Sequence, residues 1–503
     1  MEPYSFLLFS LFLLICTQAL LHLKDWVSKK RKLPPGPTGL PIVGNLLTLG
    51  HRPHESLAKL AKTYGSLMTV RLGFNITVVA SSAEMAREIL QKNDLAFLGR
   101  PIPDVVTAQT NHELSVAWLP GNTKWRGLRK ICNSHVFTTQ RLDALQGLRH
   151  QMMDGMVRRV VDASEAGEAI SIGRLVFGTT LNLLSNTMFS VDILDPKSNA
   201  IQELKELIWR IMELAGKPNL SDYFPLLKPF DVQGIRRTIK VSYDRLHVLL
   251  DEIIDQRLKR RASGLPRCED FLDVLFDQSN EQSHEEFNRE DINILLTDLF
   301  IGGTDTTTTT MEWAMTELLR NPDIMAKAKQ ELGETIGFGQ SIEEKDIPRL
   351  PYLQALLKET MRLHPTAPLL LPHRAEMDVE VCGYTIPKHA QVFVNAWAIA
   401  RDPMYWDKPT QFIPERFMGM GNEVDFRGTN FSFIPFGSGR RICPGLTLAI
   451  RMLSLLLASL IHRFDWKLLD QMAPEDIDMS DKFGITMQKV IPLVAIPVVV
   501  AKA

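Results

Sequence analysis

The segment Phe436-Gly437-Ser438-Gly439-Arg440-Arg441-Ile442-Cys443-Pro444-Gly445 carries the most specific pattern in this chain. Cys443 stands directly before Pro444, and the long apolar run at 446–464 that follows is predicted to be a helix. Proline is favoured at the first position of a helix. The positive end of a helix dipole lowers the pKa of a cysteine placed there and favours its thiolate. The pattern therefore predicts a metal-binding thiolate at Cys443. A buried cysteine without a ligand is the alternative, since free cysteines are commonly packed in cores.

The residues around this cysteine suit a flat ligand that carries acidic groups. Gly437, Gly439 and Gly445 have no Cβ atom, so the backbone can approach a macrocycle closely. Arg441 could reach an acidic group on the same ligand. The pattern Phe-x-x-Gly-x-Arg-x-Cys-x-Gly resembles the haem-binding signature of the cytochrome P-450 monooxygenases. This resemblance extends over essentially the whole chain, and it implies a haem b cofactor with Cys443 as axial thiolate ligand and Phe436 beside it.

Composition indicates one large globular catalytic unit. The chain has 503 residues, of which 45% are hydrophobic and 23% charged, as expected for a folded protein. No repeat or low-complexity linker divides it, and the net charge of -1 argues against a nucleic-acid partner. The five cysteines contain no CxxC pair, so neither a zinc site nor a disulfide framework is indicated. The resemblance implies a mainly α fold with small β-sheets, the cytochrome P-450 haem-thiolate fold.

The N-terminus is predicted to be a transmembrane helix. Residues 5–23 are uncharged and mostly apolar, and as a helix they would span roughly 28 Å, close to the thickness of a bilayer core. A cleaved signal peptide is the alternative, but no Lys or Arg precedes the run. Basic residues follow it, which places the rest of the chain on the cytosolic side. We expect an anchor at 1–23, a basic and proline-rich hinge at 24–50 and a catalytic domain at 51–503, on the endoplasmic reticulum membrane.

A Trp and an Arg are predicted to share one face of a helix. Trp125 and Arg129 are four residues apart, so an indole N–H and a guanidinium could together hold a carboxylate. The alternative is a packed tryptophan beside a surface arginine. The resemblance places this Trp-x-x-x-Arg pair on the haem propionates. It adds His373 and Arg441 as further propionate contacts, with Arg100 as another candidate.

A helix expected to run from about residue 288 to 320, with Asn288 as its N-cap, has an unusual middle. Gly302, Gly303 and the five threonines at 306–310 lower helix stability, and threonine hydroxyls can bend a helix by bonding back to carbonyl groups. A tolerated polar helix face is the alternative. The functional interpretation is a widened turn that leaves room for dioxygen. By resemblance, Asp305 and Thr306 would relay protons during dioxygen activation.

One charged pair is expected to have a structural role. Glu359 and Arg362 lie three residues apart on a predicted helix, and in isolation such a pair is an ordinary surface contact. Arg416 follows in the sequence Pro-Glu-Arg-Phe. The resemblance joins Glu359, Arg362 and Arg416 into a buried triad that stabilises the fold.

Five regions would line a substrate cavity by resemblance, namely 101–120, 206–216, 297–302, 366–371 and 483–486. Most of their side chains are apolar, and such a pocket selects its ligand by shape. A small, weakly polar terpenoid is therefore expected as substrate. The predicted pocket residues are Phe300, Ile301, Gly302, Ala367, Leu369, Leu370, Phe483 and Ile485.

The stretches 302–313 and 482–486 are similar to those of plant microsomal family members, in particular the geraniol 8-hydroxylase group of terpenoid hydroxylases. This resemblance implies a monooxygenase that uses O2 and receives electrons from NADPH through NADPH-cytochrome P-450 reductase. Hydroxylation of a diterpene or of a prenylated phenol of the geranylhydroquinone type is an alternative. A haem-thiolate isomerase or dehydratase is disfavoured by Asp305 and Thr306. A haem-based sensor or binding protein is disfavoured by the predicted open helix and the apolar, substrate-sized loops.

Overall fold

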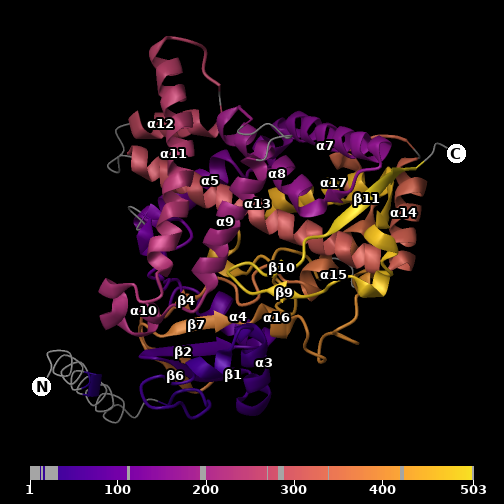
Figure 1. The fold of residues 1–503 in the computed structure, drawn as a ribbon. Coiled ribbons are helices and arrows are strands. Elements are labelled where there is room, and N and C mark those ends of the chain that lie inside the picture. The colour runs from indigo at the N-terminus through magenta and orange to yellow at the C-terminus, as the bar shows by residue number, and fades with distance from the viewer. Residues whose placement is uncertain are drawn as a thin grey trace, which may run out of the picture.

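The computed structural model describes residues 32–500 except 110–113, 193–199, 269, 281–287, 338 and 420–423, together with Phe12, Ile15 and Cys16. Helices form most of the molecule, and the small sheets lie between and beside them (Figure 1). The predicted anchor at 5–23 falls almost entirely outside these residues. Within the part of the chain that the structure describes, no helix is both long enough and apolar enough to cross a bilayer.

The helical core surrounds one central helix, α13 (Arg289–Arg320), which packs against α8 and α17. The other long helices are α5 (Thr123–His135), α7 (Gln146–Ala166), α8 (Ile172–Phe189), α9 (Ala200–Gly216), α11 (Ile235–Ala262), α14 (Pro322–Ile336), α15 (Pro351–Leu363) and α17 (Leu446–His462). Shorter helices are α2 (Leu46–Leu49), α3 (Pro53–Tyr64), α4 (Ala83–Arg87), α6 (Thr139–Ala144), α10 (Leu220–Tyr223), α12 (Phe271–Asn280) and α16 (Ala396–Ile399).

Four small sheets accompany the helices in the described part of the chain. The largest has the order β1-β2-β7-β4 and is antiparallel except where β2 pairs with β7 in parallel, with Val79 opposite Phe393. The others are β3-β11-β8 and the hairpins β5-β6 and β9-β10. Their bounds are β1 (Leu67–Leu72), β2 (Asn75–Ala80), β3 (Ile170–Ser171), β4 (His373–Arg374), β5 (Val379–Val381), β6 (Tyr384–Ile386), β7 (Gln391–Val394), β8 (Phe464–Leu468), β9 (Asp481–Lys482), β10 (Gln488–Lys489) and β11 (Val494–Val499). A mainly α fold with small β-sheets is thereby confirmed.

Helix α13 begins where the sequence predicts, at a capping box. The Asn288 side chain accepts from the Asp291 amide at 2.9 Å, and the Asp291 carboxylate accepts from the Asn288 amide at 3.0 Å. The predicted widened turn is wrong, because α13 remains an α-helix throughout. Its threonine hydroxyls donate to carbonyls four residues earlier without interrupting it, as in the 2.8 Å bond from Thr308 to Thr304.

The two glycines of α13 differ in what surrounds them. A Cβ atom on Gly303 would come within 2.5 Å of Leu184 Cδ1, so Gly303 is closely packed against the side chain of Leu184 in α8. A Cβ atom on Gly302 would meet nothing within 4 Å. The free space along this helix therefore comes from the missing side chain of Gly302 and not from an opened turn.

Glu359, Arg362 and Arg416 lie together beneath the helical core. Arg362 donates two hydrogen bonds to Glu359, at 2.7 and 2.8 Å, and Arg416 donates a third to the same carboxylate at 3.0 Å. Arg362 is fully buried and also donates to the carbonyl oxygens of Ala400 and Pro409. Breaking such a buried pair costs several kcal/mol, because one charge is left without a partner. The contacts fasten the segment after α16 to helix α15.

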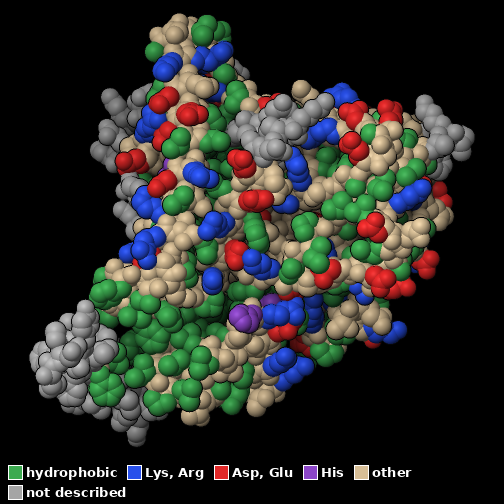
Figure 2. Space-filling view, viewed as in Figure 1, with side chains coloured by type: hydrophobic (Ala, Val, Ile, Leu, Met, Phe, Trp, Pro, Cys, Tyr) green, Lys and Arg blue, Asp and Glu red, His purple; other side chains and the backbone are tan. Residues whose placement is uncertain are grey.

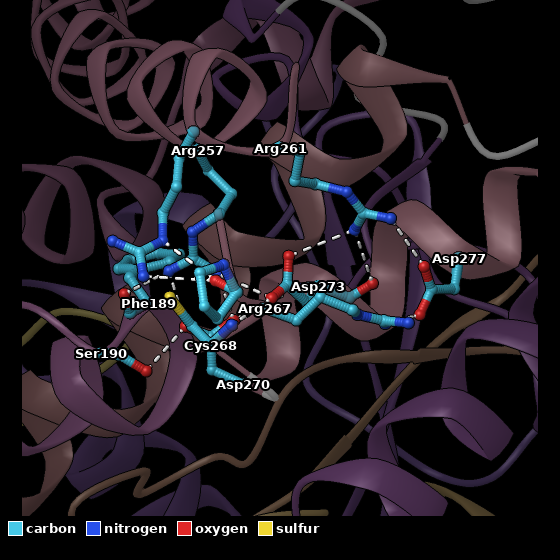
Figure 3. Close-up of polar contacts among 11 residues, drawn as sticks. Phe189, Ser190, Arg257, Arg261, Arg267, Cys268, Asp270, Asp273 and Asp277 are labelled. Carbon is cyan, nitrogen blue, oxygen red and sulfur yellow. Dashed lines mark hydrogen bonds and ion pairs between the residues drawn. The ribbon is translucent and has the colours of Figure 1, made fainter. Parts of the chain in front are cut away.

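A second polar cluster joins α11 to α12 (Figure 3). Arg257 donates to both carboxylate oxygens of Asp270 at 2.7 Å and to the carbonyl of Phe189 at 2.6 Å. Arg261 of the same helix bonds to Asp273 and Asp277. None of these residues lines the central cavity described below. We therefore interpret this cluster as structural.

Candidate active site

A cavity of about 390 Å³ lies within the helical core. All seven residues predicted to bind the cofactor line it, although they come from positions far apart in the sequence. They are Arg100, Trp125, Arg129, His373, Phe436, Arg441 and Cys443. The cavity therefore brings the cysteine segment and the predicted anion-binding residues to one site.

Cys443 lies at the cavity wall immediately before helix α17. Burial raises the pKa of its thiol, although hydrogen bonds from the Gly445 and Leu446 amides and the charge of Arg129 oppose this shift. The predicted lowering of this pKa is therefore wrong for the protein alone, because burial outweighs the helix terminus. A bound metal ion deprotonates a coordinating thiol outright, so the site remains suited to a thiolate ligand.

The glycines of this segment serve different purposes. Gly439 has φ 67°, a conformation that favours glycine, and a Cβ atom there would collide with the carbonyl oxygen of Leu90. The packing of the chain, and not the approach of a macrocycle, is therefore the reason for a glycine at position 439. Gly437 and Gly445 do line the cavity, as the sequence argument expects.

Three arginines crowd one part of the cavity wall. Each donates to backbone carbonyls: Arg100 to Leu371 at 2.6 Å, Arg129 to Ile442 at 2.8 Å and Arg441 to Leu98 at 3.1 Å. Among the described residues, none of the three forms a salt bridge with a carboxylate.

Burial and mutual repulsion disfavour these positive charges. Burial, with repulsion from Arg441 and Arg129, lowers the pKa of Arg100 well below its usual value, and its buried Nε has no partner. Burial and then repulsion from Arg129 lower the pKa of Arg441 to about 10. An anionic ligand would offset this repulsion and satisfy the orphaned donor.

Trp125 and His373 stand beside these arginines but are already engaged. The Trp125 indole N–H donates to the carbonyl of Val116 at 3.2 Å, and the Arg441 guanidinium lies 4.4 Å from the centre of the indole ring. Trp125 therefore positions arginine through a cation–π contact, where the sequence argument expected it to donate to a carboxylate. His373 Nδ1 donates to the Phe97 carbonyl at 2.8 Å, and burial lowers the pKa of His373.

Asp305 and Thr306 are neighbours in the chain but face different surroundings. Thr306 lines the cavity, and its hydroxyl donates to the Gly302 carbonyl at 2.7 Å. Asp305 does not line the cavity. Its carboxylate accepts a 2.6 Å hydrogen bond from Thr486 and another from Gln488. Thr486 itself lines the cavity, so its hydroxyl lies between Asp305 and the open space. Thr486 belongs to the predicted pocket region 483–486, but its hydrogen bond to Asp305 was not predicted.

Five of the eight predicted pocket residues line the cavity: Ile301, Gly302, Ala367, Leu370 and Ile485. The other three do not. Phe300 lies on a different side of α13 from the lining residues, because successive side chains of a helix point in different directions. It stacks on Phe189, with ring centres 5.4 Å apart. Leu369 and Phe483 pack in the cluster beside the β1-β2 hairpin, where Phe483 stacks on His54.

Several lining residues were missed by the sequence argument. Helix α8 contributes Thr180, Leu183, Leu184, Thr187 and Met188. This helix is buried almost all around, and its apolar and small polar residues form no single apolar stripe that would indicate which side faces a cavity.

Comparison with known proteins then identifies the family. The sequence profile of the cytochrome P450 family matches residues 34–494. The chain belongs to the cytochrome P450 family. Geraniol 8-hydroxylase of Swertia mussotii is 51% identical over 469 residues, which cover 93% of this chain and 94% of that protein. Geraniol 8-hydroxylase of Catharanthus roseus is 49% identical over 497 residues, or 99% of each chain. Drimenol monooxygenase of Persicaria hydropiper is 48% identical over 470 residues, or 93% of each.

Membership of the P450 family implies a monooxygenase with a haem-thiolate cofactor, which uses O2 and electrons from a reductase. The residues present fit that cofactor. Cys443 would supply the thiolate, and Arg100, Arg129 and Arg441 would supply donors and positive charge for the two propionates. The orphaned Arg100 Nε is the observation that carries this fit.

We predict that Asp305→Asn reduces the pH dependence of stability. Burial raises the pKa of Asp305 to about 6, so between about pH 4 and 6 the folded protein binds more protons than the unfolded chain. In the parent protein this carboxyl therefore lowers the free energy of unfolding as the pH rises through that range, by roughly 3 kcal/mol at most. Urea unfolding at pH 4.5 and 7.5 should show that the free energy of unfolding of the variant, relative to that of the parent, is higher at pH 7.5 than at pH 4.5.

Asp478→Asn is the matched control for this titration. Hydrogen bonding to Ser480 lowers the pKa of half-buried Asp478, so the Asp478→Asn variant should show no rise in the free energy of unfolding relative to the parent protein at high pH. A stability difference between parent and Asp305→Asn that is equal at both pH values would contradict the raised pKa of Asp305.

Proposed function

We propose that this P450 hydroxylates a C–H bond of a small, apolar terpenoid alcohol, with 8-hydroxylation of a geraniol-type monoterpenol as the reaction. The character of the cavity wall carries the proposal. Outside the arginine region, apolar side chains such as Leu184, Ile301, Leu370 and Ile485 dominate the lining. Such a wall binds a hydrocarbon skeleton by shape and excludes water from it. The two geraniol 8-hydroxylases among the relatives support the same substrate class.

A second candidate is hydroxylation of a larger substrate, namely a diterpene or a prenylated phenol of the geranylhydroquinone type. The observation that favours it is the empty space at Gly302, where a Cβ atom would meet nothing within 4 Å. A bulkier ring could occupy that space against α13. The relative named drimenol monooxygenase is consistent with a wider range of terpenoid skeletons in this part of the family.

Several side chains would contribute to the reaction without binding the substrate. The bound haem would supply dioxygen activation, with electrons that come from NADPH through NADPH-cytochrome P-450 reductase. Thr306 would hold a hydroxyl group in the cavity. Asp305, whose pKa burial raises to about 6, would hold an exchangeable proton near neutral pH and pass it to the cavity through Thr486.

We further propose that the protein lies on the endoplasmic reticulum membrane, anchored by residues 5–23 with its catalytic domain in the cytosol. An exposed apolar surface supports this location. Hydrophobic side chains gather around α10 and the β1-β2 hairpin, near the N-terminal end of the described chain (Figure 2). They include Leu40, Ile42, Leu47, Leu220, Leu226, Phe230 and Val232. Apolar patches of this kind mark membrane or protein contacts.

The substrate proposal predicts turnover of geraniol. Microsomes that contain this protein and its reductase should convert geraniol, with NADPH and ¹⁸O2, to an 8-hydroxylated product that carries one labelled oxygen atom. Microsomes with the reductase alone are the control. Turnover of a diterpene or a prenylated phenol without turnover of geraniol would favour the second candidate. Failure with every terpenoid would overturn both.

The proton role predicts that Thr306→Ala uncouples electron use from hydroxylation. Loss of the cavity hydroxyl should lower the product formed per NADPH by about tenfold or more and raise the release of hydrogen peroxide. Thr308→Ala is the matched control, because Thr308 makes the same kind of bond to α13 but does not line the cavity. Equal coupling in the two variants would rule out a special role for Thr306.

A further inference from the structure

One acidic side chain stands in the wall of the cavity. Asp298 of α13 is the only aspartate or glutamate among the described residues that line it. Among the same residues, Asp298 forms no ion pair. Burial raises the pKa of this carboxyl to about 6. An acid in such surroundings costs free energy unless hydrogen-bond donors surround it.

The hydrogen-bond donors that reach the Asp298 carboxylate come from one turn of the chain, at residues 115–117. The Ser115 hydroxyl lies 3.1 and 2.9 Å from the two carboxylate oxygens. The Ala117 amide donates to Oδ2 at 3.3 Å, and the Val116 amide also bonds to the carboxylate. A carboxylate has about four acceptor positions. Three donors therefore leave about one position for a group inside the cavity.

The position of Asp298 along α13 relates it to the reaction. Asp298, Gly302 and Thr306 follow one another at four-residue intervals, so they lie on one face of the helix. The helical rise places Asp298 about 12 Å from Thr306 along the axis. Gly302 lies between them and presents no side chain. A slender molecule can therefore lie along this face, with one end at Asp298 and the other near Thr306.

We propose that Asp298 accepts a hydrogen bond from the hydroxyl group of the substrate and so determines which carbon lies beside the haem. This inference rests on the proposed function and specifies how the same site recognises its substrate. An extended terpenol has its hydroxyl at one end, so anchoring that end presents the far end for oxidation. The hydrogen bond would also fill the remaining acceptor position of the carboxylate.

A purely structural role is the competing explanation. Asp298 holds the 115–117 turn, and Val116 of that turn accepts from Trp125 in the arginine region. If Asp298 only braced this turn, its replacement would weaken every ligand equally. A substrate contact instead affects only those ligands that donate a hydrogen bond, and this difference separates the two roles.

The first test uses the unmodified holoprotein with geraniol and geranyl methyl ether. The ether keeps the carbon skeleton and the oxygen atom but has no O–H donor. Dissociation constants are measured from the substrate-induced change in the haem spectrum. The value for the ether should be about tenfold or more higher than that for geraniol, as expected for the loss of a hydrogen bond to a charged acceptor. Equal affinities would overturn the inference without the need for any variant.

The second test uses Asp298→Asn. Its amide oxygen can still hold the 115–117 turn, while its NH2 group can donate to an alcohol and to an ether alike. Geraniol should therefore bind as weakly as the ether, the ether should bind as before or better, and hydroxylation should spread over several carbons. If the variant bound both ligands more weakly by the same factor and hydroxylated the same carbon as the parent, Asp298 would only hold the 115–117 turn, and the inference would be overturned.

Ser115→Ala is the matched control, because it removes a donor to the carboxylate but leaves the acceptor. This variant should keep the preference for geraniol over the ether. The outcomes also separate the inference from the proposed function. Preference for the alcohol without turnover would overturn the proposed reaction alone. Hydroxylation of geraniol by a protein that binds both ligands equally would overturn only the role of Asp298.

Discussion

Enclosure of charge within an apolar interior is the constraint on which this structure depends. Cys443 lies at the wall of a buried cavity, where desolvation disfavours its anion, and three arginines share that wall without carboxylate partners among the described residues. Each group is unfavourable alone. A ligand that brings a metal cation to the sulfur and two carboxylates to the guanidinium groups would offset both costs. The haem-thiolate cofactor of the P450 family has this composition.

The rest of the fold holds the walls of this cavity in place. Helix α13 supplies one wall as an unbroken α-helix, and Gly303 is closely packed against Leu184 of α8. The Glu359 triad fastens the segment after α16 to α15, with every guanidinium contact directed to a carboxylate or a carbonyl. The Arg257 cluster does the same between α11 and α12. Rigid walls of this kind allow an apolar pocket to select by shape.

Local motifs could be predicted from the sequence, and contacts between distant segments could not. The Asn288 cap and the cysteine segment depend on neighbouring residues, and both were found. Phe483 was misplaced because its neighbour in space, His54, lies far away in the sequence. Thr486 and Asp298 fall within predicted pocket regions, but their hydrogen bonds could not be predicted, since their surroundings form only when other segments fold against α13. The Trp125 indole was assigned to a carboxylate because the Val116 carbonyl, which accepts its hydrogen bond, has no sequence pattern.

Replacement of Cys443 by serine tests whether this sulfur is the ligand of the haem iron. The reduced holoprotein should give the thiolate-type carbon monoxide difference spectrum, and Cys443→Ser should lose this spectrum together with hydroxylation. Cys132→Ser is the control, because burial raises the pKa of that neighbouring thiol to about 12 and suits it to packing. Its spectrum should match that of the parent. A Cys443→Ser protein that kept both the parent spectrum and its hydroxylase activity would contradict the account.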